Sequence, residues 1–405
     1  MTSAPPDQPQ RLPWHIVDLF AGPGGLDLGA EVLGIPSIGI EWDDDAVATR
    51  LAAGLRTVHG DVRFFGPDHP DFKDCTVLAG GPPCQTFSIA GSGSGRKAFD
   101  LVTGFIHRMH AWYTREKAGM NGETWEDIQR ELDKLEDERT GLVLQPLRWI
   151  FEAMLRPRHE ENEPRPFDVI VLEQVPSVIE VWHEYEKVLK AVGYQTSAKV
   201  YHTEQYGVPQ TRRRAVLVAR HTEIPKDFLA ATHHQYRKGV RAGEVVSGGR
   251  EPWVSMAGAL RDVYACVEEA TPRTMPFCVV SNYGSGGDPK ARGRRESDQP
   301  SATITGKWKR NRIVGLDARE TEMERLSNEE AGVFQTFPYR YPWRGNDQAQ
   351  QIGNAVPPWF GVHVLSAALD HGIPQDARGE LLRWRSRAGE QGVPADTDTD
   401  TDTQA

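Results

Sequence analysis

Short apolar runs that end at a polar residue or a glycine turn constrain the fold of this chain most. Five of them cover residues 15–20, 38–40, 76–79, 167–172 and 216–219, and helical stretches such as 26–33 lie between them. β-branched runs that alternate with helices are typical of a parallel sheet with crossover helices, whose strands are buried on both faces. We therefore predict an α/β fold with a doubly wound, mostly parallel sheet.

Chemically reactive or ligand-binding residues follow these runs directly. Residues 18–25 follow the first run, and Glu41, Cys84 and Glu173 come at the ends of later ones. Ligands of open α/β sheets bind at the carboxyl ends of the strands. We therefore expect these residues to meet at one cleft, although they are far apart in sequence.

The strand–helix alternation also divides the chain into regions. It extends over residues 12–220, is completed by 347–385, and is lost over 221–346, which is rich in glycine, arginine and aromatic residues. We predict a first domain from the alternating segments and a second, smaller domain from 221–346. Residues 1–11 and 389–405 are polar or repetitive and are expected to be disordered.

A helix-rich insertion is predicted at about residues 95–141. Residues 91–95 (GSGSG) before it are flexible by composition. Within the insertion, 125–138 reads as an amphipathic helix that begins with a capping box of Thr124 and Asp127.

Composition sets limits on the class of protein. The chain is 39% hydrophobic and 26% charged, which is typical of a globular protein. No run of about 18 apolar residues occurs, residues 1–11 lack the apolar core typical of a signal peptide, and the four cysteines form no paired motif. We expect a cytoplasmic location, reduced thiols, no membrane contact and no metal site. The net charge of −10 does not exclude a nucleic-acid partner, because binding depends on local charge and basic clusters occur at 212–214, 290–295 and 307–312.

The glycine turn after the first run has a ligand-binding and a purely structural interpretation. Gly22, Gly24 and Gly25 let the backbone approach a ligand closely, but a plain tight turn would need them too. The dinucleotide fingerprint fails at its third glycine, where Asp27 stands, and this disfavours a nicotinamide-dependent dehydrogenase.

Three residues beyond the turn support a nucleoside ligand. Glu41 can accept hydrogen bonds from ribose hydroxyls. Trp42 offers a flat face for adenine or belongs to the core, and Asp61 accepts from an adenine amino group or caps a turn.

Residues 81–85 (GPPCQ) give the sharpest chemical signal. A lone cysteine is usually a small core residue, but Cys84 stands in a Gly/Pro-rich turn at a strand end. Such a position suits a nucleophile, which would need a lowered pKa because a free thiol is only slightly ionised near neutral pH.

Two further features suit catalysis or binding. Glu173 ends a buried run, and a buried carboxyl resists ionisation and can donate a proton, whereas a helix cap is the structural alternative. In 210–214 (QTRRR), strand alternation places Arg212 and Arg214 on one face, where they suit a phosphate or carbonyl oxygen or form a basic surface.

Together these stretches resemble the DNA (cytosine-5) methyltransferase family. The matching pieces occur in the family's order at 18–25 (DLFAGPGG), Glu41, Asp61, 80–88 (GGPPCQTFS), 173–175, 206–214 (YGVPQTRRR), 298–305, 334–337 (FQTF) and 351–358 (QIGNAVPP). The resemblance spans roughly residues 16–360 and implies a Rossmann-like methyltransferase fold that uses S-adenosylmethionine.

The resemblance also implies roles for individual residues. Cys84 would be the nucleophile, Glu173 would contact N3 of the target cytosine, Arg214 its O2, and Arg212 would support the closed catalytic loop. The implied cofactor-binding residues are Asp18, Phe20, Ala21, Gly22, Gly24, Gly25, Leu26, Glu41, Trp42, Asp61, Val62, Pro82, Asn354 and Ala355. The second domain would recognise the target, with Gln85, Ser88, Arg292, Arg294, Arg295, Lys307 and Lys309 as candidate DNA contacts.

The implied reaction methylates carbon 5 of cytosine in a short double-stranded DNA sequence, with base flipping and a covalent Cys84 adduct at carbon 6. A restriction–modification or related defence system is implied, with a possible endonuclease partner and a monomeric enzyme. The alternatives are methylation of tRNA by the same machinery and a non-catalytic DNA-binding relative.

Two departures from the family are informative. Gln174 replaces the usual asparagine, and its extra methylene could shift the hydrogen bonds that position the Cys84 turn. The 95–141 insertion is longer than usual, and could bind a partner, extend the DNA contact or pack on the surface.

Overall fold

A seven-stranded sheet forms the centre of the computed structural model, which describes residues 14–83, 93–135, 137, 139–157, 163–240, 249–281 and 293–388. The strand order is β3-β2-β1-β4-β5-β8-β6, and every neighbouring pair is parallel except the two pairs that include β8. The strands are β1 Ile16–Leu19, β2 Ser37–Glu41, β3 Thr57–His59, β4 Val77–Gly80, β5 Val169–Gln174, β6 Gln195–His202 and β8 Arg213–Arg220. This confirms the predicted mostly parallel α/β sheet.

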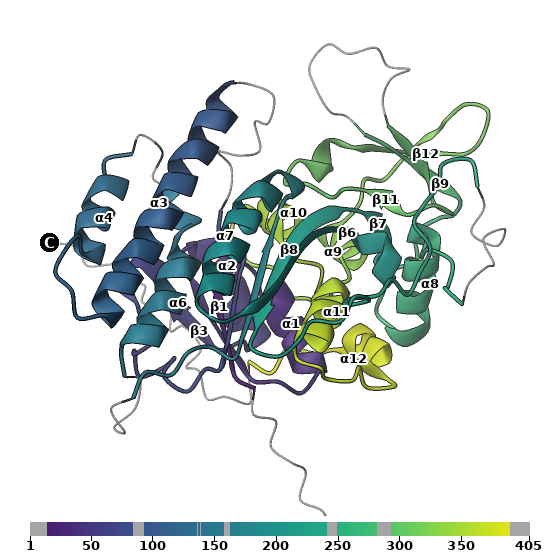
Figure 1. Ribbon diagram of the computed structural model, residues 1–405. Coiled ribbons are helices and arrows are strands. Elements are labelled where there is room, and N and C mark those ends of the chain that lie inside the picture. Colours follow the sequence, from purple (N-terminus) through teal and green to yellow (C-terminus); the bar gives the residue numbers. More distant parts are fainter. Residues whose placement is uncertain are drawn as a thin grey trace, which may run out of the picture.

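Both faces of the sheet are buried, as the continuous apolar strands predict. Val17 and Leu19 of β1 belong to one hydrophobic core, and Ile16 belongs to the core on the opposite face. Helices α6 (Gln145–Leu155) and α7 (Ile179–Ala191) cover the first face, while α1 (Gly25–Val32) and α11 (Pro358–Ala368) cover the second (Figure 1). α11 comes from the far end of the chain, so the C-terminal segment packs against the same sheet as the N-terminal helices.

The order of the strands fixes where a ligand can bind. From β1 the chain first moves outward through β2 and β3, and then returns to place β4 and β5 on the other side of β1. At such a switch point the loops after β1 and β4 diverge and leave a crevice at the carboxyl ends of the strands. The glycine turn follows β1, and residues 81–83 follow β4.

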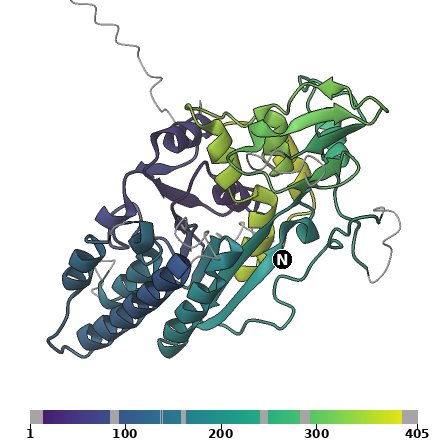
Figure 2. The same ribbon diagram turned by 90° about the horizontal axis from the view of Figure 1, so that it is seen from above.

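A second sheet lies at the opposite end of the molecule from the helical insertion (Figures 1 and 2). It has four antiparallel strands in the order β10-β9-β12-β13, namely β10 Arg294–Glu296, β9 Phe277–Val280, β12 Arg312–Gly315 and β13 Glu322–Met323. Helices α8 (Met256–Cys266), α9 (Asn328–Phe334) and α10 (Gln348–Asn354) pack into its core, and α12 (Ala377–Arg383) contacts α8. Strands β7 (Gln210–Thr211) and β11 (Ser301–Ala302) pair in parallel and connect the two regions.

The insertion forms a helical hairpin that packs on the first domain. α3 (Gly93–Lys117) contacts α6 and α7, and α4 (Trp125–Leu132) lies against α3. Ile128 and Leu132 of α4 are buried, and Thr124 and Asp127 form the predicted capping box. This geometry supports surface packing as one role of the insertion.

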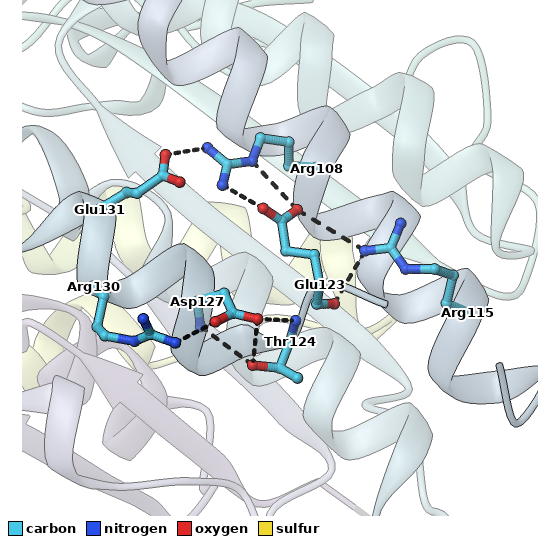
Figure 3. A network of polar contacts seen from close by, with 7 residues as sticks. All are labelled: Arg108, Arg115, Glu123, Thr124, Asp127, Arg130 and Glu131. Atoms are coloured by element: carbon cyan, nitrogen blue, oxygen red, sulfur yellow. Dashed lines mark hydrogen bonds and ion pairs between the residues drawn. The ribbon is translucent and has the colours of Figure 1, made fainter. Parts of the chain in front are cut away.

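Ion pairs hold the two helices of the hairpin together (Figure 3). Arg108 of α3 contacts Glu123 at 2.5 Å and Glu131 of α4 at 2.6 Å, and Arg115 also approaches Glu123. These side chains remain partly exposed, so solvent screens the pairs, and the apolar contacts of α4 carry most of the stability.

Several sequence-based boundaries need correction. α3 begins at Gly93, so the end of the predicted flexible run is helical, and α4 ends at Leu132 rather than at residue 138. β3 and β6 were not predicted, because β3 is short and β6 is an edge strand of mostly half-buried or exposed residues without an apolar run. The predicted disordered tails lie outside the described residues. In the described segments, no helix has the length and apolar character needed to span a membrane.

Candidate active site

A cavity of about 540 Å³ lies at the carboxyl ends of β1, β2, β4 and β5. Its volume is within the range of small-molecule sites. It brings together most of the predicted catalytic and cofactor-binding residues, namely Asp18, Phe20, Ala21, Gly22, Gly25, Leu26, Glu41, Trp42, Glu173, Arg214, Asn354 and Ala355. The expected convergence of strand ends therefore occurs.

The turn after β1 forms one wall of the cavity and has an unusual backbone. Phe20, Gly22 and Gly24 have φ values of 61°, 54° and 97°, in the left-handed region. Glycine adopts these values freely, but phenylalanine does so only under strain. Gly25 then starts α1 so close to Val356 that an added Cβ would lie 2.0 Å from its carbonyl oxygen.

Glu41 supports this wall with its carboxylate. Oε2 accepts a hydrogen bond from the Gly22 N–H at 2.7 Å, and Oε1 accepts from the N–H groups of Trp42 and Asp43, each at 2.9 Å. A carboxylate has about four acceptor positions, so one remains for a ligand hydroxyl.

Trp42 stands at the rim with 62% of its surface exposed. A core tryptophan is therefore excluded, and the ring is available as a platform for a flat ligand. The side chain of Asp61 instead caps a short turn and pairs with Arg63 at 2.6 Å. Asp61, Val62, Gly24 and Pro82 are not among the residues that line the cavity, and their contact with a cofactor stays a prediction.

Asp18 is a buried carboxyl within this cavity. Burial raises its pKa well above the usual value, and the nearby charges of Asp27, Glu41 and Glu173 act in the same direction. Arg50 opposes the shift. An acidic, partly aromatic pocket of this kind fits a cationic nucleoside such as S-adenosylmethionine.

The opposite wall carries an ion pair. Glu173, near the end of β5, contacts Nε of Arg214, near the start of β8, at 2.5 Å, because β5 and β8 are antiparallel neighbours. Burial raises the pKa of Glu173, although Arg214 opposes this, and burial lowers the pKa of Arg214. The Glu173 carboxyl is therefore a better proton donor than an isolated glutamate, whereas the Arg214 guanidinium keeps its proton and acts as a hydrogen-bond donor.

Gln174 connects this wall to the turn that precedes Cys84. Its Nε2 donates to the Pro82 carbonyl at 2.6 Å, while its Oε1 accepts from the Val175 N–H. The longer side chain therefore still reaches the turn, and Pro83 lines the cavity. Cys84 itself lies outside the described residues, as do Gln85, Ser88 and Arg292.

Arg212 does not share the environment of Arg214. It is almost fully buried and donates to the carbonyl oxygens of Ile304, Gly353 and Ala355 at 3.0–3.1 Å. Arg212 and Arg214 are both buried and Arg213 between them is exposed, in agreement with the predicted alternation, but the two buried guanidinium groups have different partners. Arg212 holds the backbone beside Asn354 instead of facing the cavity.

The remaining candidate DNA contacts lie in the second region, and most of their side chains contact other residues of the same chain. Arg294 pairs with Glu320 at 2.9 Å, and the guanidinium of Arg295 lies 4.6 Å from the Tyr236 ring centre. Lys309 lies 5.6 Å from the Trp308 ring centre, and Lys307 is exposed. Their contact with DNA stays a prediction.

The cavity residues that sequence reasoning missed include two at the end of the insertion. Arg139 and Leu142 of α5 (Arg139–Leu142) line the cavity although they are more than 50 residues beyond Cys84. The insertion separates them from the other motifs, and no local pattern marks them.

Comparison with known proteins agrees with this geometry. The family profile of C-5 cytosine-specific DNA methylases matches residues 14–106 and 160–369 and leaves out 107–159, which includes most of the hairpin. The type II methylase M.HgiDII of Herpetosiphon aurantiacus is 31% identical over 390 residues, with 85% of this chain and 92% of the relative covered. The type II methyltransferase M1.HphI of Haemophilus parahaemolyticus is 24% identical, with 87% and 86% covered.

Solved structures show the same fold. A DNA modification methyltransferase encoded within an E. coli prophage superposes with a TM-score of 0.53 at 15% identity, covering 88% of this chain and 99% of the other. The Dnmt2 methyltransferase of S. pombe gives a TM-score of 0.52 at 14% identity, covering 88% and 98%. With the profile match extending over well more than half of its residues, the chain belongs to the C-5 cytosine-specific DNA methylase family.

Proposed function

We propose that this DNA cytosine-5 methyltransferase modifies one short duplex sequence with Cys84 as its covalent nucleophile and S-adenosylmethionine as its methyl donor. One observation carries the proposal. The Glu173–Arg214 pair and the Glu41-supported turn face the same cavity, and Pro83, the residue before Cys84, lines it as well. A target base and a methyl donor can therefore share one site.

The first step activates the base. Cytosine carbon 5 is a poor nucleophile, and attack of the Cys84 thiolate on carbon 6 makes it electron-rich by covalent catalysis. The Glu173 carboxyl, whose pKa is raised by burial, donates a proton to N3 as the carbon–sulfur bond forms. Arg214 donates a hydrogen bond to O2.

The second step transfers the methyl group and restores the enzyme. The cofactor supplies an electrophilic methyl group on its sulfonium. Carbon 5 takes this group, and S-adenosylhomocysteine leaves as a neutral thioether. N3 returns its proton to Glu173. The carbon-5 proton passes to solvent water, and its bonding electrons re-form the 5,6 double bond as the Cys84 thiolate leaves carbon 6. The target base must leave the duplex to reach the cavity, at a cost of about a few kcal/mol.

Two contextual features belong to the same proposal. The curated relatives are named as type II methyltransferases, which supports a restriction–modification role and an endonuclease that cuts the same sequence. The second region, with Arg294, Arg295, Lys307 and Lys309, supports recognition of duplex DNA rather than tRNA. We expect the enzyme to act as a monomer.

The test is methylation sequencing of a methylation-free host that expresses the chain, with Cys84→Ala as the control. We expect 5-methylcytosine at one short motif that disappears in the control. Purified protein should also form a stable adduct with duplex DNA containing 5-fluorocytosine. Methylation of tRNA without DNA methylation would overturn the choice of substrate, and DNA methylation by the Cys84→Ala variant would overturn the nucleophile.

A further inference from the structure

The turn that faces the cofactor is strained, and strain of this kind needs support. Phe20 has a φ of 61°, flanked in the same turn by positive values at Gly22 and Gly24. Non-glycine residues in the left-handed region cost about 1–3 kcal/mol and persist only where their surroundings hold them. Neighbouring residues must therefore fix the backbone of this turn.

Arg50 of α2 (Asp44–Ala53) contacts the turn without lining the cavity. It is fully buried, pairs with Asp27 of α1 at 2.7 Å, and its Nη1 lies 3.5 Å from the Ala21 carbonyl oxygen. It also donates to the Arg56 carbonyl at 3.2 Å and to Thr57 Oγ at 3.0 Å. One guanidinium therefore ties the turn to α1, α2 and the start of β3.

The space for this guanidinium is built into the sheet. A Cβ added to Gly39 of β2 would lie 2.1 Å from Nη2 of Arg50. A glycine in the interior of a strand often marks such a close approach. Asp27, which breaks the dinucleotide fingerprint, is held by Arg50 and by the Ser37 hydroxyl at 2.8 Å.

Tyr341 supports the same turn from the other end of the chain. This buried residue lies between α9 and α10, and its hydroxyl donates to the Pro23 carbonyl oxygen. Phe337, Trp343 and Trp384 pack around its ring and fix its position. Neither Arg50 nor Tyr341 lines the cavity.

We propose that Arg50 and Tyr341 are positioning residues that set the affinity for S-adenosylmethionine by holding the strained turn, without contact to the cofactor. The proposal rests on the proposed function, because it takes the cavity to be the cofactor site. It gives a functional role to Arg50 and Tyr341, two buried polar residues that take no part in the proposed chemical steps. It also explains why residues from the two ends of the chain meet under the turn.

The decisive variant is Tyr341→Phe, which removes one hydroxyl and leaves the ring. Tyr185→Phe is its matched control, because the Tyr185 hydroxyl is equally buried and donates at 2.6 Å to a carbonyl, that of Val143, that does not belong to the turn. Titration calorimetry of the full-length protein with S-adenosylhomocysteine measures the affinity. We expect it to weaken about three- to tenfold in Tyr341→Phe, as loss of one buried hydrogen bond implies, and to stay unchanged in Tyr185→Phe.

Steady-state kinetics add a second readout. Tyr341→Phe should raise KM for S-adenosylmethionine and leave kcat unchanged, because the turn binds ground state and transition state alike. Arg50→Lys should weaken binding less than Arg50→Met, since lysine keeps the charge but not the planar fork. Unchanged affinity in Tyr341→Phe, or an equal loss in both tyrosine variants, would overturn the inference. Failure of the wild-type protein to bind S-adenosylhomocysteine would instead overturn the proposed function on which it rests.

Discussion

The two walls of the cavity are built in different ways. We call the wall that is proposed to bind S-adenosylmethionine the cofactor wall, and the wall that is proposed to bind the target base the target wall. The cofactor wall depends on backbone geometry, with a strained turn whose N–H groups and carbonyls are bound by Glu41, Arg50 and Tyr341. The target wall depends on side chains that contact one another, Glu173 with Arg214, and on Gln174, which holds Pro82. Changes on the first wall should alter affinity for the cofactor, and changes on the second should alter the rate of the chemical step.

The largest effect is expected from Glu173→Gln on the target wall. Glutamine cannot transfer a proton to N3, and general acid catalysis contributes about 10²–10⁴-fold, so kcat should fall by that factor. The KM for S-adenosylmethionine should stay close to the wild-type value. Single-turnover methylation of duplex DNA at varied cofactor concentration measures both quantities. If cofactor affinity falls as much as the rate does, the two walls do not have separate roles.

Glu41→Gln is the counterpart on the cofactor wall. The carboxylate accepts three backbone hydrogen bonds, whereas an amide offers one acceptor and brings a donor that faces other donors. We expect affinity for S-adenosylhomocysteine to fall about ten- to a hundredfold, as loss of charge-assisted bonds implies. At saturating cofactor, kcat should be largely retained. A drop in kcat without a loss of affinity would contradict the assignment.

The two walls should respond to pH in opposite directions. Burial raises the pKa of Glu173, so its protonated form is lost as pH rises through that pKa, and kcat should then fall by about tenfold per pH unit. Burial also raises the pKa of Asp18, and its ionised form attracts the cationic methyl donor, so affinity for S-adenosylmethionine should increase as pH rises.

Asp18→Asn separates these two effects. It should remove the pH dependence of cofactor affinity and leave the pH dependence of kcat in place. Calorimetry and kinetics over the same pH series measure the two quantities. If affinity for S-adenosylmethionine falls as pH rises in the wild-type protein, Asp18 does not play this part.

The smallest effect is expected from Gln174→Ala. It removes the hydrogen bond to the Pro82 carbonyl, and loss of one such bond implies about a three- to tenfold lower kcat. Gln174→Asn restores the side chain usual in the family and shows whether the shorter amide reaches Pro82 here. Equal kcat in the alanine variant and the wild type would mean that the turn holds its shape without this contact.

The site residues at strand ends could be predicted from sequence, because each of them lies at the end of a buried apolar run or within it. Asp18, Glu41 and Glu173 come directly after or within such runs, and the parallel sheet brings their strand ends to one edge. Arg214 was placed correctly by the same logic. Arg212 is also buried, as alternation predicted, but it contacts the carbonyl oxygens of Ile304, Gly353 and Ala355, which belong to distant segments that a local pattern does not reveal.

The rest of the site depends on contacts between distant segments. Arg139 and Leu142 line the cavity from α5, which contacts α3 of the hairpin, and Tyr341 reaches the turn through packing of the second region. Arg50 in a helix reads as an ordinary surface residue, yet it is fully buried. Tertiary packing alone gives these residues their environment.

The α3–α4 hairpin has a consequence for how such enzymes can be extended. It starts beyond Cys84 and ends before Arg139, so the chain leaves the cavity and returns to it after an excursion of its own. Its tip is exposed, with 63% of the Met120 surface accessible to solvent. The family profile does not match most of the hairpin. Exposed tips tolerate inserted sequence. A DNA-binding domain of chosen sequence specificity, fused at this tip, would direct methylation to a selected genomic site. Both walls of the cavity would stay unchanged.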